Sequence, residues 1–202
     1  MKAPFQKREP STHFGILVNK SAANYERSQV TRLLEAIRKK NNYYTIVEPN
    51  SAMELLNQAE ALAGMRRSRR RLSPDEQRRG EISALIAAGG DGTVNLVARA
   101  ALDAGLPMGI LPLGRHNNIA VSLYETARPE KCISKILEKK QKRIDYAVVA
   151  NQKFFGSLGL GLVPILEKHL SKNGKPRFGF GWNRLGNKAA SSCAVRNSII
   201  KV

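Results

Sequence analysis

The residues best suited to chemistry lie in one segment, Ala87-Ala88-Gly89-Gly90-Asp91-Gly92-Thr93-Val94-Asn95. Glycines permit positive φ and carry no side chain, so backbone amides there can approach a phosphate closely. A carboxylate at Asp91 repels phosphates unless a divalent cation or a transferable proton lies between them. Mg²⁺ is the natural mediator, because it binds one or two carboxylates together with phosphate oxygens. The segment predicts a phosphate-binding turn, and a Gly-Asp-Gly turn without a ligand is the alternative.

Two further segments carry polar and small residues suited to the same ligand. They are Asn19 to Ala23 and Pro112 to Asn118, and each follows a short apolar run. Open α/β sheets bind ligands at the carboxyl ends of their strands, so the three segments are expected to surround one crevice. The chain contains neither the Walker A pattern nor Gly-x-Gly-x-x-Gly, which argues against P-loop chemistry and ordinary dinucleotide binding.

The elements that must position these segments alternate between strand and helix. The apolar patterns predict strands at 14–18, 43–47, 82–87 and 108–111, and helices around 30–37, 52–62, 94–102 and 117–123. Residues 89–92 are expected to form a tight loop between the third strand and its helix, and Ser51 with Glu54 to cap the second helix. Such alternation implies parallel pairing through right-handed crossovers, hence an open α/β sandwich over residues 12–125.

The pattern changes after a further predicted helix at 129–137. Two strand-like runs, 144–149 and 153–158, follow each other with only Ala150-Asn151-Gln152 between them. No helix intervenes, so we expect a β-hairpin that begins an antiparallel layer or a second domain. The segment from Gly174 onward has few periodic apolar positions and is expected to be poorly ordered.

Composition limits the class of protein. The chain has 202 residues, 42% of them hydrophobic, which predicts a globular protein with one full domain and part of another. It contains no run of about 20 apolar residues and no apolar leader, so a cytosolic location is expected. Cys132 and Cys193 are too few for a disulfide framework and are expected to be reduced thiols.

The formal net charge is +18, and its distribution is uneven. Seven arginines against two acids lie at residues 66–80, and eight lysines or arginines without an acid follow from Lys168. We interpret the arginine run as a solvated insertion, with contact to anionic lipid head groups as the functional alternative. Aromatic residues do not alternate with its arginines, so specific nucleic-acid binding is not expected.

Three motifs together resemble the catalytic domain of the diacylglycerol kinase family, which includes sphingosine and ceramide kinases and bacterial lipid kinases. They are Asn19-x-Ser21, Gly89-Gly90-Asp91-Gly92-Thr93-x-Asn95 and Gly109-Ile110-Leu111-Pro112-Leu113-Gly114-x-x-Asn117. The resemblance spans about residues 12–160. It implies an NAD kinase/phosphofructokinase-like nucleotide-binding α/β sandwich at 12–142, followed by the incomplete start of an antiparallel β-sandwich lipid-binding domain at 143–202.

The resemblance also implies a function, an ATP- and Mg²⁺-dependent lipid kinase acting on a diacylglycerol- or sphingoid-like hydroxyl at a membrane surface, with peripheral contact to anionic lipid. Asp91 would be the catalytic residue and lie nearest to the metal. The residues expected to contact ATP are Asn19, Lys20, Ser21, Ala22, Ala23, Gly89, Gly90, Asp91, Gly92, Thr93, Val94, Asn95, Gly114, Arg115 and Asn117.

The chain departs from the family pattern at several positions. The usual Asn-Pro-x-Ser-Gly is replaced at Asn19 to Ala23, with loss of a glycine, and a nucleotide-contacting Thr is replaced by Arg115. Asn118 and Leu96 stand where the family has acids. The family also carries a catalytic acid late in its second domain, beyond the length of this chain, so truncation is expected to impair activity.

Two other functions stay open beside the lipid kinase. An NAD kinase-like enzyme with a soluble substrate shares Gly-Gly-Asp-Gly-Thr, although Asn19-x-Ser21 and Pro112-Leu113-Gly114 favour the lipid branch. A degenerate nucleotide-binding domain without activity, whose basic segments bind anionic membrane or nucleic acid, fits the chain length and the charge.

Overall fold

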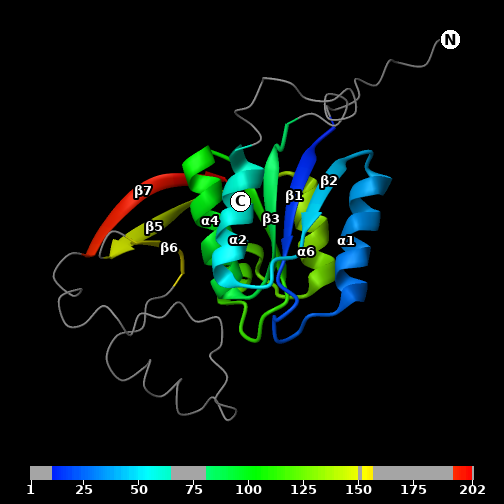
Figure 1. Cartoon of the computed structure of the whole chain (residues 1–202), viewed down its shortest axis with the longest axis horizontal. Coiled ribbons are helices and arrows are strands. Elements are labelled where there is room, and N and C mark those ends of the chain that lie inside the picture. Colours follow the sequence, from blue (N-terminus) through cyan, green and yellow to red (C-terminus); the bar gives the residue numbers. More distant parts are fainter. Residues whose placement is uncertain (1–10, 65–80, 150–151, 157–192, 202) are drawn as a thin grey trace.

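A parallel sheet of four strands forms the centre of the molecule (Figure 1). The structure is a computed structural model that describes residues 11–64, 81–149, 152–156 and 193–201. The strands are β1 (His13–Val18), β2 (Tyr43–Val47), β3 (Ala84–Gly89) and β4 (Met108–Pro112), and their order in the sheet is β2-β1-β3-β4. Every neighbouring pair is parallel, which confirms the predicted α/β alternation.

Helices cover both faces of this sheet. On one face lie α1 (Arg27–Lys39) and α6 (Pro129–Glu138), and on the other α2 (Ala52–Gly64) and α4 (Asp91–Ala104). Successive side chains of a strand point to opposite faces, so Ile16 joins the core under α1 and α6, whereas Leu17 joins the core under α2 and α4. Both side chains are fully buried, as expected for a parallel sheet covered on both faces.

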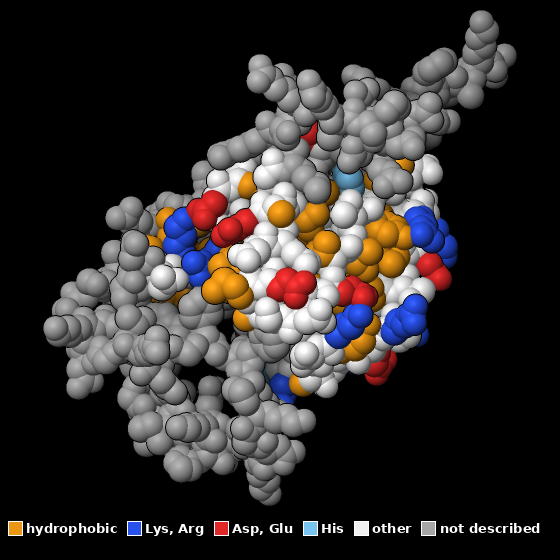
Figure 2. Space-filling view, in the orientation of Figure 1, with side chains coloured by type: hydrophobic (Ala, Val, Ile, Leu, Met, Phe, Trp, Pro, Cys, Tyr) orange, Lys and Arg blue, Asp and Glu red, His pale blue; other side chains and the backbone are white. Residues whose placement is uncertain are grey.

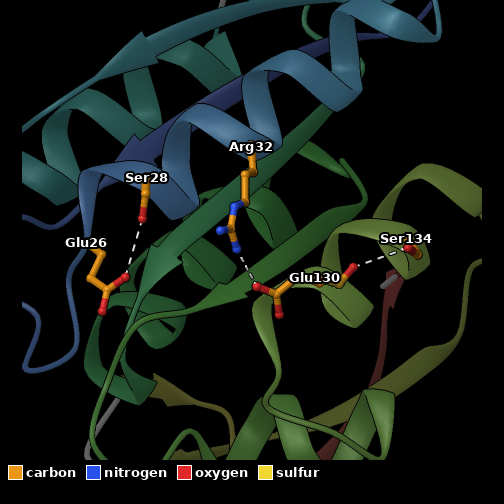
Figure 3. A network of polar contacts seen from close by, with 5 residues as sticks. All are labelled: Glu26, Ser28, Arg32, Glu130 and Ser134. Carbon is orange, nitrogen blue, oxygen red and sulfur yellow. Dashed lines mark hydrogen bonds and ion pairs between the residues drawn. The ribbon is translucent and has the colours of Figure 1, made fainter.

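The packing of α1 against α6 depends mainly on apolar side chains. Val30, Leu33 and Ile37 recur at helical spacing on α1 and are buried. Arg32 of α1 also forms an ion pair with Glu130 of α6 at 2.7 Å (Figure 3). Both partners are more than half exposed, so the pair contributes at most about 1 kcal/mol.

The exposed edge formed by α1 carries much of the Lys and Arg visible on this side of the molecule (Figure 2).

The predicted cap of α2 is present. The backbone amide of Glu54 donates to Ser51 Oγ at 3.1 Å, and the Glu54 carboxylate accepts from the amide of Asn50 at 2.9 Å. The return contact therefore reaches one residue further back than a capping box requires, but it satisfies a free amide at the helix start in the same way.

The predicted loop at residues 89–92 is wrong. Gly89 is the last residue of β3, Gly90 is the N-cap of α4, and Asp91 with Gly92 begins the helix. The strand was expected to start at Ile82, which is only 1% exposed but precedes the paired residues. The strand was therefore predicted to begin two residues too early, because Ile82 is an apolar core residue that does not pair with another strand.

A second, antiparallel sheet lies beside α4 in the order β6-β5-β7 (Figure 1). The strands β5 (Arg143–Val149) and β6 (Gln152–Phe154) form the predicted hairpin. The strand β7 (Cys193–Lys201), which was not expected, pairs with β5. The expected poor order of the segment from Gly174 onward stays a prediction. Residues 174–192 and the arginine run lie outside the described residues, and the division at 142/143 stays a prediction.

The helix α5 (Asn118–Tyr124) follows β4, which is the strand at one edge of the sheet. The backbone amide of Ile110, in β4, donates to the hydroxyl of Tyr124 at 3.0 Å. Burial raises the pKa of Tyr124 to about 12, although this hydrogen bond opposes the shift. Within the described part of the chain, no helix is long and apolar enough to span a bilayer.

We predict that Tyr124→Phe makes the protein less sensitive to alkaline pH. The unfolded tyrosine ionises near its ordinary pKa of 10, whereas the folded one resists ionisation up to about 12, so Tyr124 favours the folded state below pH 10 and loses that effect between the two values. At neutral pH the Phe variant is less stable by about 1–3 kcal/mol, since the Ile110 amide lacks its acceptor. In urea titrations this difference narrows by about 1 kcal/mol from pH 9 to 11; a constant difference would contradict the prediction.

Candidate functional site

The order of the strands defines where a ligand is expected. From β1 the chain continues to β2 on one side and later returns to β3 on the other side of β1. The strand order therefore reverses between β1 and β3, although all four strands are parallel. Ligands of open α/β sheets bind outside the carboxyl ends of the strands at this switch point. Asn19 follows β1 there, and it joins the two strands: its amide donates to the Ala88 carbonyl at 2.9 Å and its Nδ2 donates to Thr93 Oγ1 at 3.0 Å.

Two glycines bring the loops after β3 and β4 into direct backbone contact. A Cβ added to Gly114 would lie 2.4 Å from the Cα of Gly90, and a Cβ on Gly90 would lie 3.0 Å from the Cα of Gly114. Gly89 is equally confined, because a Cβ would lie 2.4 Å from Thr93 Oγ1. None of these three glycines adopts a positive φ; among the described glycines, only Gly105 and Gly156 do so. The loops need glycine because they need space.

The loop after β4 is held by two asparagines. Asn117 is 7% exposed and has a φ of 54°, and its side chain accepts from the Gly114 amide and donates to the Gly114 carbonyl, both at 2.8 Å. Asn24 was not among the predicted residues, yet it also holds this loop. Its backbone amide donates to the Leu113 carbonyl at 2.9 Å, and its side-chain Nδ2 donates to the Gly114 carbonyl at 2.7 Å. The sequence did offer a signal for Asn24, because asparagine side chains in loops commonly bond to backbone groups and Asn24 directly follows the motif at Asn19 to Ala23.

The helix α4 begins where Gly90 lies against Gly114. Gly90 is an extended N-cap without a side-chain cap, and the first helical bond runs from the Val94 amide to the Gly90 carbonyl at 3.0 Å. Helix geometry therefore leaves the amides from Gly90 to Thr93 without acceptors inside the helix. Free amides and the positive end of the helix dipole favour an anion at this position.

Asp91 connects α4 to α5. Its Oδ1 accepts from the amide of Ile119 at 3.0 Å, and its Oδ2 accepts from the amide of Asn118 at 3.1 Å. The carboxylate thus satisfies the first amides of α5, and its place beside a metal and the reacting oxygens stays a prediction. The role of these two amides could not be inferred from side-chain types, because any residue except proline supplies an amide.

Not every predicted contact residue faces the switch point with its side chain. Lys20 forms an ion pair with Glu48 after β2, and that hydrogen bond raises the pKa of Lys20. Asn95 Oδ1 accepts from the amide of Phe155 in the segment after β6, and Val94 is buried in the core. The remaining predicted contacts of the first and third loops are exposed or half-buried at the rim: Ser21, Ala22, Ala23 and Arg115.

The donor set fits one kind of metal site. Among the described residues, no three His, Cys, Asp or Glu side chains gather around a common point. Asp91 provides one carboxylate, and each of its oxygens accepts a single amide, so further lone pairs stay available. A Mg²⁺ ion held by this carboxylate and by phosphate oxygens fits the described residues, whereas an all-protein cage does not.

The fold and the loop geometry define an open α/β domain with free helix amides at its switch point. Residues 13–149 match the diacylglycerol kinase catalytic domain, which is more than half of the chain. The chain therefore belongs to the diacylglycerol kinase catalytic-domain family. It is also 40% identical over 84 residues to a protein of Serratia proteamaculans named "Probable lipid kinase YegS-like".

Solved structures support the same fold. A diacylglycerol kinase from Bacillus anthracis superimposes with a TM-score of 0.60 and 17% identity, covering 79% of this chain and 50% of that protein. The Serratia match covers 40% of this chain and 28% of the relative. The chain thus spans about half the length of the solved structure, and its matched segment a smaller share of the curated relative.

We predict that Gly114→Ala destabilises the protein. The new Cβ would overlap the backbone of Gly90, which cannot rotate away as a side chain can, so the free energy of unfolding falls by about 1–3 kcal/mol. The matched control is Gly64→Ala at the end of α2, where a Cβ meets nothing within 4 Å and the change is neutral or slightly stabilising. Urea titration followed by circular dichroism measures both, and equal stability of the two variants would contradict the proposed close approach.

Proposed function

We propose that this chain binds ATP with its phosphates at the N-terminus of α4 and forms the catalytic part of a lipid kinase. The observation that carries the proposal is the contact between Gly90 and Gly114, which leaves the free amides of α4 at the switch point of a family member's sheet. The acceptor we propose is the hydroxyl of a diacylglycerol- or sphingoid-like lipid, in keeping with the family and with the lipid kinase named among its relatives.

Phosphoryl transfer requires mainly positioning and charge stabilisation from the protein. The amides of Gly90, Asp91 and Gly92 bind and orient the phosphates, while Asn19 and Asn117 keep the two flanking loops in place. Asp91 would hold Mg²⁺, which would supply positive charge to neutralise the phosphates. The lipid hydroxyl oxygen forms a bond to the γ-phosphorus as the bond from that phosphorus to the β–γ bridging oxygen breaks. The bridging oxygen leaves with ADP, and the hydroxyl proton passes to solvent.

A lipid acceptor implies that phosphoryl transfer takes place at a membrane surface. We propose a cytoplasmic protein with peripheral contact to anionic lipid, and the net charge of +18 supports this. On the described surface, Lys and Arg of the exposed edge along α1 would add to such attraction (Figure 2).

The test compares Asp91→Asn with the unmodified chain. Asparagine has the size of aspartate, and its Oδ1 can still accept from one of the two α5 amides, so we expect this variant to fold. It lacks the charge that would hold Mg²⁺. The matched control is Asp103→Asn, which changes the same residue type in the last turn of α4, where Asp103 pairs with Lys153. The proteins are incubated with γ-labelled ATP, Mg²⁺ and either a mixed lipid extract or NAD.

We expect labelled lipid from the unmodified chain and from Asp103→Asn, and a loss of at least about 100-fold with Asp91→Asn. Label on NAD without labelled lipid would contradict the proposal and would indicate a kinase with a soluble substrate. Absence of any labelled product would favour the degenerate nucleotide-binding domain and would overturn the proposed activity of this chain.

A further inference from the structure

The second sheet is joined to α4 next to the proposed phosphate site. The amide of Phe155 donates to Asn95 Oδ1 at 2.7 Å, and the Phe155 ring, 2% exposed, packs against Tyr146 with 5.8 Å between ring centroids. Both aromatic residues belong to the same hydrophobic core as the buried residues of α4. The segment after β6 is therefore seated by apolar packing and by one hydrogen bond to a side chain of α4.

The side chain of Asn95 makes a second contact that leads to Asp91. Its Nδ2 donates to the Asp91 carbonyl at 3.0 Å. The two contacts together fix the orientation of the amide, because only the nitrogen can donate to a carbonyl and only the oxygen can accept from an amide. Asn95 is thus positioned by both neighbours and joins the Phe155 backbone to the first turn of α4.

The contacts continue from Asp91 and return to the second sheet. The Asp91 carboxylate accepts from the amide of Ile119. The Ile119 side chain in turn lies against Gly156, where an added Cβ would come within 3.0 Å of Ile119 Cγ1. Phe155, Asn95, Asp91, Ile119 and Gly156 therefore form a closed circuit of direct contacts, so a displacement of the second sheet acts on Asp91 from both sides.

We infer that Asn95 is a positioning residue that couples the second sheet to the orientation of Asp91. The consequence for phosphoryl transfer rests on the proposed function, but the coupling itself does not. Asn95 acts here through Asp91 and through Phe155, which differs from the direct contact with ATP that its motif predicted. The second sheet thereby controls the geometry of the phosphate site from a place outside the switch point.

A second link between the same elements provides the control. Lys153 of β6 forms an ion pair with Asp103 in the last turn of α4. Asp103 lies 12 residues after Asp91, about 18 Å along the helix. Lys153→Met therefore removes a contact between β6 and α4 but leaves the circuit through Asp91 intact.

The experiment follows individual backbone amides by ¹⁵N NMR in the full chain. In Asn95→Ala, the Phe155 amide loses its acceptor and exchanges with solvent up to about tenfold faster, and the signals of the Asn118 and Ile119 amides shift. Asn95→Asp retains an acceptor for Phe155 but no donor for the Asp91 carbonyl, so Phe155 stays protected while Asn118 and Ile119 still shift. Lys153→Met changes none of these three signals.

Signals of Asn118 and Ile119 that move no more in Asn95→Ala than in Lys153→Met would overturn the inference. So would unchanged protection of Phe155 in Asn95→Ala. In the labelled-phosphate assay, both Asn95 variants turn over at least about tenfold more slowly at saturating ATP, while KM for ATP changes less than about threefold. An inactive unmodified chain would contradict the proposed function alone, because the NMR signals report the coupling without turnover.

Discussion

The close approach of Gly90 to Gly114 is the constraint on which the candidate site depends. The two backbones meet at the carboxyl ends of β3 and β4, and neither residue can carry a side chain without displacing the other. Because Gly90 is also the N-cap of α4, the same contact fixes where the helix begins and where its free amides point. The candidate phosphate site is therefore a consequence of backbone packing between two loops.

This packing explains why the asparagines around the site bind mainly backbone groups of the loops. Asn24 and Asn117 both bond to Gly114, and Asn19 bonds to the end of β3 and to Thr93. Each satisfies backbone or hydroxyl groups that the loops leave without regular partners. Three asparagines thus hold three loops in register, and the amides of α4 stay available for a ligand.

The sequence predicted the elements with strong local patterns and failed where distant contacts decide. The strand Tyr43–Val47 was predicted to the residue, since five strand-forming residues lie between polar neighbours. The start of α4 was missed, because Gly-Asp-Gly suggests a loop until Gly90 meets Gly114 and Asp91 meets α5. The strand β7 was missed because its partner β5 lies about 50 residues earlier and pairing at that distance leaves no local signal.

The candidate site shows the same division. Motif spacing identified Asn19, Gly90 and Gly114, whose contacts are described above, but it could not distinguish a residue that touches a ligand from one that positions another residue. Asn95 lies one helical turn after Asp91, so both belong to the motif, yet its side chain contacts Phe155, 60 residues later. A motif residue can therefore serve the site by joining it to the rest of the protein. In this chain the start of α4, the candidate phosphate-binding turn, is held by the loops of the first sheet and, through Asn95, by the second.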